Sequence, residues 1–406
     1  MTTPNAPFSR PEQLARPQKL AIAASYLGWT LDAFDYFLMV MLLKAISEAF
    51  GSDIKAVSEG LFYTLAARPL GALVFGTLAD RFGRRPVLMA VIVLYSGLSA
   101  ASGLAQSLGQ LLLIRALFGF AMGGEWGVGA ALVMESIPAH WRGRVSGLLQ
   151  SGYPTGFLLA SLAYYLAFDH IGWRGMFMLG AAPALVVMLI RMGVEEPPAH
   201  LPPAGAAPMG LAAGLRAHWR LGLYLVVLMT AFNFFSHGTQ DLYPAFLQKQ
   251  HHFGTHLTST IVFVMNLGAI AGTFTFGPLS DHIGRRRAIV IAALAALPVL
   301  PLWAFAQSAL WLAVGAFFMQ AAVQGAWAVV PAHLNELAPA PIRAMFPGFV
   351  YQLGNLIASR NAPWQSAIAQ AHHDDFGLAL GLVAGITAVV LAVWCALGPE
   401  RRGQAL

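Results

Sequence analysis

Apolar residues recur along the chain in blocks of roughly 20, and each block is long enough for a helix to cross a hydrocarbon core of about 30 Å. Short polar stretches separate the blocks, and none of these stretches is long enough to form a soluble domain. The pattern predicts twelve membrane-spanning helices over residues 20–44, 58–79, 87–106, 109–134, 145–168, 174–193, 220–247, 257–279, 288–306, 309–334, 345–369 and 376–397. We therefore expect an all-α membrane protein.

A segment rich in Pro, Ala and Gly separates the sixth predicted span from the seventh. Its composition over residues 194–219 is typical of an irregular linker. We expect an N-terminal six-helix half over residues 1–193, this linker on the cytoplasmic side, and a C-terminal six-helix half over residues 220–406.

A sequence repeat relates the two predicted halves. The loop after the second span reads Gly76-Thr-Leu-Ala-Asp80-Arg81-Phe-Gly83-Arg84-Arg85, and a similar loop, Gly277-Pro-Leu-Ser-Asp281-His-Ile-Gly284-Arg285-Arg286, lies 201 residues later. The same offset relates Gly124 to Gly325, Trp126 to Trp327, Glu135 to Glu336 and Arg142 to Arg343. Matches in two separate regions at one offset indicate a tandem duplication. Since six is an even number, the halves have the same topology and form two pseudo-symmetric bundles around an axis along the membrane normal.

Composition and charge agree with a membrane protein. Apolar residues make up 57% of the chain and charged residues 10%, whereas soluble domains carry roughly 25% charged residues. With the N-terminus in the cytoplasm, 17 Lys and Arg residues fall in cytoplasmic segments, and four fall on the other side: Lys44, Lys55, Arg174 and Lys249. The positive-inside rule therefore predicts a multi-pass protein of the cell inner membrane with both termini cytoplasmic. This distribution explains the net charge of +6 without a nucleic-acid partner.

The loop motif after the second span has a physical interpretation of its own. Gly76 and Gly83 permit close helix approach and a tight turn, and Asp80 can accept hydrogen bonds at a neighbouring helix N-terminus. We expect a cytoplasmic charge network that holds the two halves together in one state and releases them in another. Its residues are Gly76, Asp80, Arg81, Gly83, Arg84, Asp281, Glu135 and Arg142. The alternative is that the arginines serve only as topology anchors.

This motif resembles the loop between the second and third spans of the major facilitator superfamily, and it recurs in slightly degraded form in the second half. Arg115, followed by Gly119 and Gly123, is similar to the span-four motif of that superfamily. The resemblance covers essentially the whole chain. It implies the major facilitator fold and a secondary transporter that works by alternating access.

Span seven resembles a narrower group. Its sequence Asn233-Phe-Phe-Ser236-His237-Gly-Thr239-Gln240-Asp241 is similar to the signature of the lactate permease branch of the sialate–proton symporter family. Ala245 stands where that signature has a Thr, while Tyr351-Gln352-Leu-Gly354-Asn355 and Arg68 also resemble the branch. Members carry monocarboxylates such as lactate and pyruvate, or sialic acid, together with protons.

Ionisable residues at membrane depth are costly and therefore indicate function. Asn233, Ser236, His237, Gln240 and Asp241 form one helical stripe, which must face a hydrated cavity or other polar groups. Arg68 has Ala269 as its counterpart in the second half, so the repeat itself does not require a cation there. We expect substrate binding by Arg68, Asn233, His237, Gln352 and Asn355. The alternatives are an Arg68 salt bridge with Asp35, Glu125 or Asp241, and ordinary interhelical hydrogen bonds for the polar side chains.

Four buried acids are candidates for proton coupling: Asp241, Asp35, Asp32 and Glu125. Asp241 lies one turn from His237, with which it can share a proton. Asp32 and Asp35 are close enough to repel each other, which favours protonation of one of them. Arg115 is expected to be the structural partner of an acid.

The predicted function is proton-coupled symport of a small monocarboxylate of the lactate and pyruvate class, with the lipid bilayer as surroundings and a monomer as the working unit. One alternative is symport of sialic acid or another organic acid, and another is proton-antiport efflux of hydrophobic compounds. The sequence contains no nucleotide-binding loop and no nucleophile–base pair, so an enzyme is not expected. No cofactor or metal is expected, and the single Cys395 provides no disulfide.

Overall fold

The structure is a computed structural model that describes residues 14–82, 84–126, 130, 133–134, 137–138, 141–192, 216–339 and 346–401. Within these ranges, the side chains of residues 76–77, 79–81, 84–85, 88 and 182–192 are not described. The predicted linker over 194–219 therefore lies almost wholly outside the described residues.

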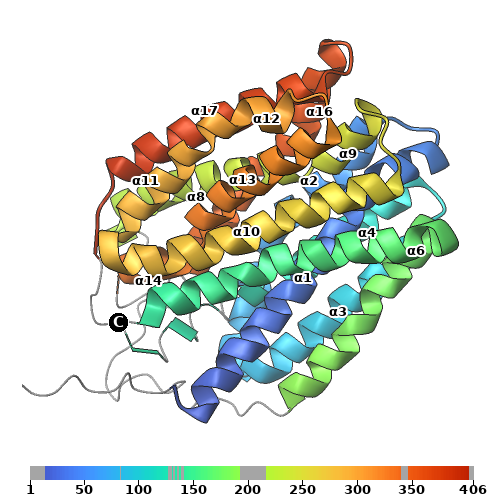
Figure 1. Ribbon diagram of the computed structural model, residues 1–406. Coiled ribbons are helices and arrows are strands. Elements are labelled where there is room, and N and C mark those ends of the chain that lie inside the picture. Colours follow the sequence, from blue (N-terminus) through green and yellow to red (C-terminus); the bar gives the residue numbers. More distant parts are fainter. Residues whose placement is uncertain are drawn as a thin grey trace, which may run out of the picture.

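The described part of the N-terminal half consists mainly of long helices (Figure 1). These are α1 (Arg16–Ala49), α2 (Ile54–Phe82), α3 (Arg84–Gly103), α4 (Leu108–Met122) and α6 (Arg142–Met192). The last of these contains two spans, because Gly172 has φ 62° and ψ −177° and interrupts the helix. This break lies between the predicted spans 145–168 and 174–193.

Several spans of the C-terminal half consist of two consecutive helices. Span seven is α8 (Trp219–Gln240) and α9 (Tyr243–Lys249), and span eight is α10 (Thr255–Ile283). Span nine contains α11 (Arg285–Ala295), the 3₁₀ turn η2 (Leu297–Val299) and α12 (Leu300–Ala304). Span ten is α13 (Ala309–Trp327) and α14 (Val330–Leu337), span eleven is α15 (Phe346–Ala358) and α16 (Asn361–Ala371), and span twelve is α17 (Phe376–Ala396).

Proline explains three of these interruptions. Pro244, Pro331 and Pro363 lie within the first three residues of α9, α14 and α16. A proline ring has no N–H to donate to the carbonyl four residues earlier, and it clashes with that carbonyl. The backbone carbonyls of Gln240, Trp327 and Ser359 are thereby freed at membrane depth.

The two halves lie against each other along two helix pairs. The first half of α6 packs along α10, and α2 packs against α15 and α16. In Figure 1 the N-terminal half and the C-terminal half form two adjacent layers, with α6 and α10 side by side at their boundary. The start of α1 and the end of α17 lie at the same end of the bundle, which we call the terminal end.

Helix packing confirms the internal repeat. Gly71 of α2 lies directly on the backbone of Phe120, and Gly272 of α10 lies in the same way on the backbone of Ala321. Both members of the second pair follow the first by 201 residues. Glycine permits this close helix approach because it has no Cβ.

The distribution of polar side chains is the reverse of that in a soluble protein. Arg68 and Asp241 are 3% and 1% exposed, whereas Leu310 and Ile386 are 69% and 62% exposed. By length and composition alone, five described helical segments qualify as membrane spans: Trp219–Lys249, Thr255–Ile283, Arg285–Ala304, Ala309–Leu337 and Phe376–Ala396. A bilayer provides the apolar surroundings that such a surface requires.

Candidate functional site

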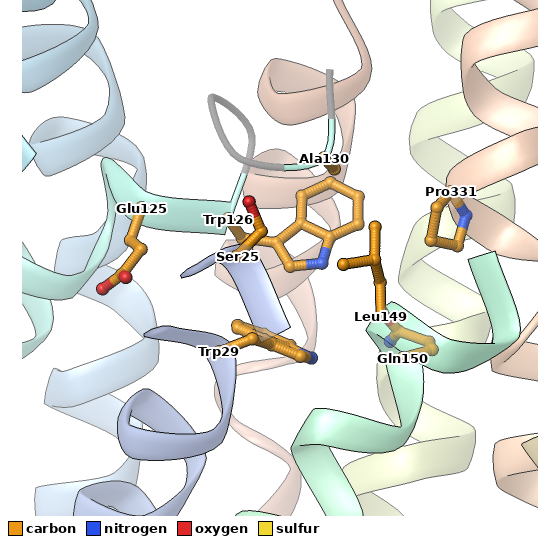
Figure 2. A pocket seen from close by; sticks show the side chains of 8 residues that line it. All are labelled: Ser25, Trp29, Glu125, Trp126, Ala130, Leu149, Gln150 and Pro331. Carbon is orange, nitrogen blue, oxygen red and sulfur yellow. The ribbon is translucent and has the colours of Figure 1, made fainter. Parts of the chain in front are cut away.

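A cavity of about 220 Å³ lies between the two halves, where spans one, five, seven, ten and eleven meet. We call it the central cavity. It is lined by Trp29, Gln150, Tyr153, Asn233, Ser236, His237, Gln324, Trp327 and Tyr351. A second cavity of about 370 Å³ shares Trp29 and Gln150 with the first and extends toward the terminal end. Figure 2 shows this second cavity, with Glu125 at one end of its lining and Pro331 at the other.

The polar stripe of span seven reaches the central cavity, since Asn233, Ser236 and His237 all line it. Further along the helix, His237 Nδ1 lies 3.2 Å from Asp241 Oδ1, so these two side chains meet as their spacing predicts. Asp241 directly follows the last residue of α8, Gln240, and precedes the break that Pro244 causes. The histidine–aspartate pair therefore lies where regular helical hydrogen bonding ends.

Tyr36 of α1 joins this pair from the other half of the protein. Its hydroxyl donates a hydrogen bond of 2.9 Å to Asp241 Oδ2 and lies 3.3 Å from His237 Nδ1. No role was predicted for this tyrosine from the sequence. The 201-residue offset could have indicated this tyrosine, because Tyr36 is the counterpart of His237 in the repeat.

Arg68 lies next to this cluster. Its Cζ is 5.7 Å from the centre of the Tyr36 ring, and Asp32 acts on it electrostatically. Its Nη2 approaches the sulfur of Met122 at 3.6 Å, while its Nε has no hydrogen-bond partner among the described residues. No described carboxylate forms a salt bridge with it, so the alternative of an internal salt bridge with Asp35, Glu125 or Asp241 is not seen in this conformation.

Gln352 and Asn355 of α15 lie beside the cavity and connect the halves. The Gln352 side chain donates to the carbonyl of Gly123 at 3.2 Å, and Asn355 donates to Gln352 Oε1 at 3.1 Å. Neither residue lines the two cavities. Tyr351, immediately before Gln352, does line the central cavity.

The structure separates the four candidate acids. Asp241 contacts Tyr36 and His237, Asp32 acts on Arg68, and Glu125 lines the second cavity. Asp35 instead accepts a hydrogen bond of 3.0 Å from Ser99 inside the N-terminal half.

Arg115 interacts electrostatically with Asp35, as expected for the structural partner of an acid. Its Nη2 donates to Ser102 at 2.6 Å, and its Cζ lies 4.1 Å from the centre of the Phe118 ring. Asp241 and Asp35 therefore belong to two different buried clusters. One is central and bridges the halves, and the other lies within the N-terminal half.

Amide side chains connect span seven to spans ten and eleven. Gln240 donates to Gln320 at 2.8 Å, Gln320 donates to Thr239 Oγ1 at 2.9 Å, and Gln365 donates to the carbonyl of Gly238 at 2.8 Å. Of these three amides, only Gln240 was predicted from the sequence to belong to the polar stripe. Buried amides hold such a helix break rigid because they occupy carbonyls and hydroxyls that have no helical partner.

Charged residues at the terminal end form the candidate gating network. Arg285 binds Glu336 through contacts of 3.1 and 3.0 Å and Asp281 at 2.7 Å. Asp281 also lies against Gly143 at the start of α6, across the boundary between the halves. Arg142 is buried and donates to the carbonyl of Met134 at 3.3 Å. The other candidate gating residues, Gly76, Asp80, Arg81, Gly83, Arg84 and Glu135, lie outside the described side chains.

At the opposite end, polar contacts close the gap between the halves. Arg360 binds Glu59 at 3.0 Å, Gln370 donates to Asp53 at 3.1 Å, and His256 lies 3.3 Å from Asp169. Each contact joins a residue of one half to a residue of the other. This conformation is therefore closed at the end away from the termini. Among the described residues, no group of three or more His, Cys, Asp or Glu is arranged to hold a metal.

Comparison with known proteins decides the family. The model of the Major Facilitator Superfamily matches residues 20–359 and 226–405. The chain belongs to this superfamily. It is thus a multi-pass membrane transporter and not an enzyme, with twelve spans in two six-helix bundles.

Relatives and a solved structure agree with this membership. A carboxylic acid transporter protein homolog of Saccharomyces cerevisiae is 28% identical over 86% of this chain and 61% of its own length. The sialic acid transporter NanX of Escherichia coli is 28% identical over 84% of this chain and 85% of its own length. The proton:xylose symporter XylE superposes with a TM-score of 0.77 at 19% identity, over 95% of this chain and 97% of XylE.

Proposed function

We propose that this transporter of the Major Facilitator Superfamily imports a small monocarboxylate together with protons across the cell inner membrane. One arrangement carries the proposal: a buried arginine that forms no salt bridge with a described carboxylate lies next to a tyrosine that contacts a buried histidine–aspartate pair. Arg68 supplies a cation for the carboxylate, since a guanidinium can bind a carboxylate through two parallel hydrogen bonds. Asp241 and His237 supply a place for the proton.

Tyr36 connects the anion and the proton in this scheme. A deprotonated Asp241 accepts a charge-assisted hydrogen bond from Tyr36, which is stronger than a bond to a neutral group. Protonation of Asp241 weakens this bond and removes a negative charge from the neighbourhood of Arg68. The arginine then attracts an anion more strongly. Proton and anion thus favour each other's binding.

A cavity that holds both proton and anion has little net charge, and a neutral cavity passes through a closed state at lower desolvation cost. The halves then rock around the site. We propose that the terminal end faces the cytoplasm, so the conformation described here is closed to the outside. In the opposite conformation the cytoplasmic end would be held closed by Asp281, Arg285 and Glu336, together with Arg142 and the loop motif after span two.

Lactate and pyruvate are the first candidates because of the signature in span seven, and sialic acid is the second. A carboxylic acid transporter homolog and a sialic acid transporter among the relatives support a carboxylate as the shared feature. Proton-antiport efflux of hydrophobic compounds is the rival. It would require an apolar cavity, whereas Gln150, Asn233, Ser236, His237 and Gln324 line this one.

Uptake by the purified protein in proteoliposomes tests the proposal. Labelled lactate, pyruvate and sialic acid are supplied under an imposed inward proton gradient, with and without an uncoupler, and protein-free liposomes serve as the control. We expect accumulation of at least one acid that the uncoupler abolishes. Accumulation that ignores the uncoupler would disprove proton coupling, and absence of uptake for every carboxylate would disprove the substrate class.

A further inference from the structure

Aromatic rings from five spans form the walls of the two adjoining cavities. Trp29, Tyr153, Trp327 and Tyr351 line the central cavity, and Trp126 lines the second cavity beside Trp29 (Figure 2). The rings are ordered with respect to one another. Trp29 stacks on Tyr153 at 5.3 Å between ring centres, Trp126 lies 4.4 Å from Tyr351, and Trp327 lies 5.7 Å from Tyr351.

These rings contact one another across the boundary between the halves, since Trp126 belongs to the N-terminal half and Tyr351 to the C-terminal half. Rings that only filled a core would leave no volume between them. Here the rings border the two adjoining cavities.

The same walls carry polar atoms that have no partner. Trp29 Nε1, Gln150 Oε1, Asn233 Oδ1 and Gln324 Oε1 are buried and make no hydrogen bond within the part of the chain that the structure describes. All four side chains line the central cavity. Buried polar groups normally have partners, so a ligand or water must supply them here.

We infer that the substrate is a monocarboxylate whose tail is a ring with hydrogen-bonding substituents. This inference rests on the proposed function, because Arg68 is taken to bind the carboxylate. Flat ring faces stack on aromatic side chains, and ring hydroxyls or heteroatoms would occupy the unpartnered atoms of Trp29, Gln150, Asn233 and Gln324. Lactate has one methyl and one hydroxyl, so it would leave most of the aromatic wall and most of these polar atoms uncovered.

Binding to the full-length protein in lipid nanodiscs tests the inference, with tryptophan fluorescence as the readout because three tryptophans line the cavities. The probes are quinate, nicotinate and N-acetylneuraminate as substituted ring acids, cyclohexanecarboxylate as an unsubstituted ring acid, and lactate and pyruvate as short acids. At least one substituted ring acid is expected to bind tenfold or more tightly than lactate and cyclohexanecarboxylate, which is the effect of one or more added hydrogen bonds.

Two substitutions test the hydrogen bonds that we assign to the substituents of the substrate ring. Gln150→Met removes the amide at similar volume, and Trp29→Phe keeps a ring but removes the indole N–H. Each should weaken binding of the preferred ring acid by roughly tenfold, the effect of one hydrogen bond, and should weaken binding of lactate by less. Gln307→Met is the matched control, because Gln307 is exposed and donates to the carbonyl of Phe305 away from the cavities.

Tighter binding of lactate or pyruvate than of every ring acid would overturn the inference and leave the proposed function standing. Equal effects of Gln150→Met on lactate and on the ring acid would overturn it as well, because the amide would then not contact the ring substituents. Proton-driven uptake shows whether the proposed function fails as well. If no carboxylate binds and none accumulates, both the proposed function and the inference are wrong.

Discussion

Tyr36 and His237 occupy the same position in the two halves of the repeat, 201 residues apart, and the Tyr36 hydroxyl lies 3.3 Å from His237 Nδ1. Two equivalent residues can touch only where they lie close to the pseudo-twofold axis. Tyr36 also donates to Asp241, so the axis passes beside the proposed proton site. A small rotation of one half against the other would alter these contacts directly.

Replacement of Tyr36 by Phe tests this link. The substitution removes the hydroxyl that donates to Asp241 but keeps the ring beside Arg68. Loss of a hydrogen bond to a charged group, about 1.5–3 kcal/mol, should reduce proton-driven uptake by roughly ten- to hundredfold while anion binding persists. Tyr26→Phe is the control on the same helix, since Tyr26 bonds Thr155 at 3.0 Å outside the central cluster. Equal effects of the two substitutions would contradict a coupling role for Tyr36.

Asp241 and Asp35 provide a second comparison, because they lie in different buried clusters. Asp241→Asn removes the proton site of the central cluster, so net uptake should no longer respond to the proton gradient while exchange of internal for external anion continues. Asp35→Asn should leave the gradient response in place. Counterflow and gradient-driven uptake of both variants in proteoliposomes measure this. The reverse pattern would place proton coupling in the Asp35–Ser99–Arg115 cluster.

The ion pair at the terminal end makes a stability prediction. Arg285 and Glu336 are both buried and bonded at 3.0 Å, so Glu336→Gln removes one of the two carboxylates that pair with Arg285 and leaves Asp281 at 2.7 Å. Because Arg285 keeps Asp281, we expect a loss of about 1–3 kcal/mol, which is less than the cost of leaving a buried charge wholly unpaired. Glu48→Gln, which breaks the more exposed pair with Lys44 at 3.8 Å, should cost less than about 1 kcal/mol. Unfolding by denaturant in detergent micelles compares the two, and similar losses would show that the Arg285 network does not stabilise this conformation.

The close packing of span two against span four leads to a second stability prediction. A Cβ at Gly71 would collide with the backbone of Phe120, whereas a Cβ at Gly97 would meet nothing within 4 Å. Gly71→Ala should therefore lower the yield of folded protein and its thermal stability. Gly97→Ala should be neutral or stabilise the helix by up to about 1 kcal/mol. Size-exclusion profiles and thermal unfolding report both, and a tolerated Gly71→Ala would mean that spans two and four can move apart without loss.

The sequence predicted the fold well because the duplication and the apolar blocks are each strong signals. The 201-residue offset related loops and glycines that do pack in the same way, as Gly71 on Phe120 and Gly272 on Ala321 show. The helix breaks inside spans seven, ten and eleven were not predicted. The prolines that cause them stand in otherwise continuous apolar blocks, where hydropathy alone gives no boundary.

The candidate site was only partly visible in the sequence. The spacing of His237 and Asp241 places them on one helix face, and their contact follows from that spacing alone. The direction in which the Asp35 side chain points depends on how spans one and three pack. Its separation from the central cluster therefore could not be predicted. Tyr36, Trp29 and Gln150 were overlooked because aromatic and amide residues are common in membrane helices, and only their convergence from different spans makes them notable.

Arg68 is the residue on which the whole scheme depends, and anion uptake by its variants tests it most directly. Arg68→Ala, which reproduces the Ala269 of the second half, and Arg68→Lys are compared with the exposed Lys55→Ala in proteoliposomes under an inward proton gradient. We expect no carboxylate uptake for Arg68→Ala, strongly reduced uptake for Arg68→Lys because an ammonium group cannot bind a carboxylate through a rigid fork, and normal uptake for Lys55→Ala, with all three proteins folded. Undiminished uptake by a folded Arg68→Ala protein would contradict carboxylate binding at this arginine.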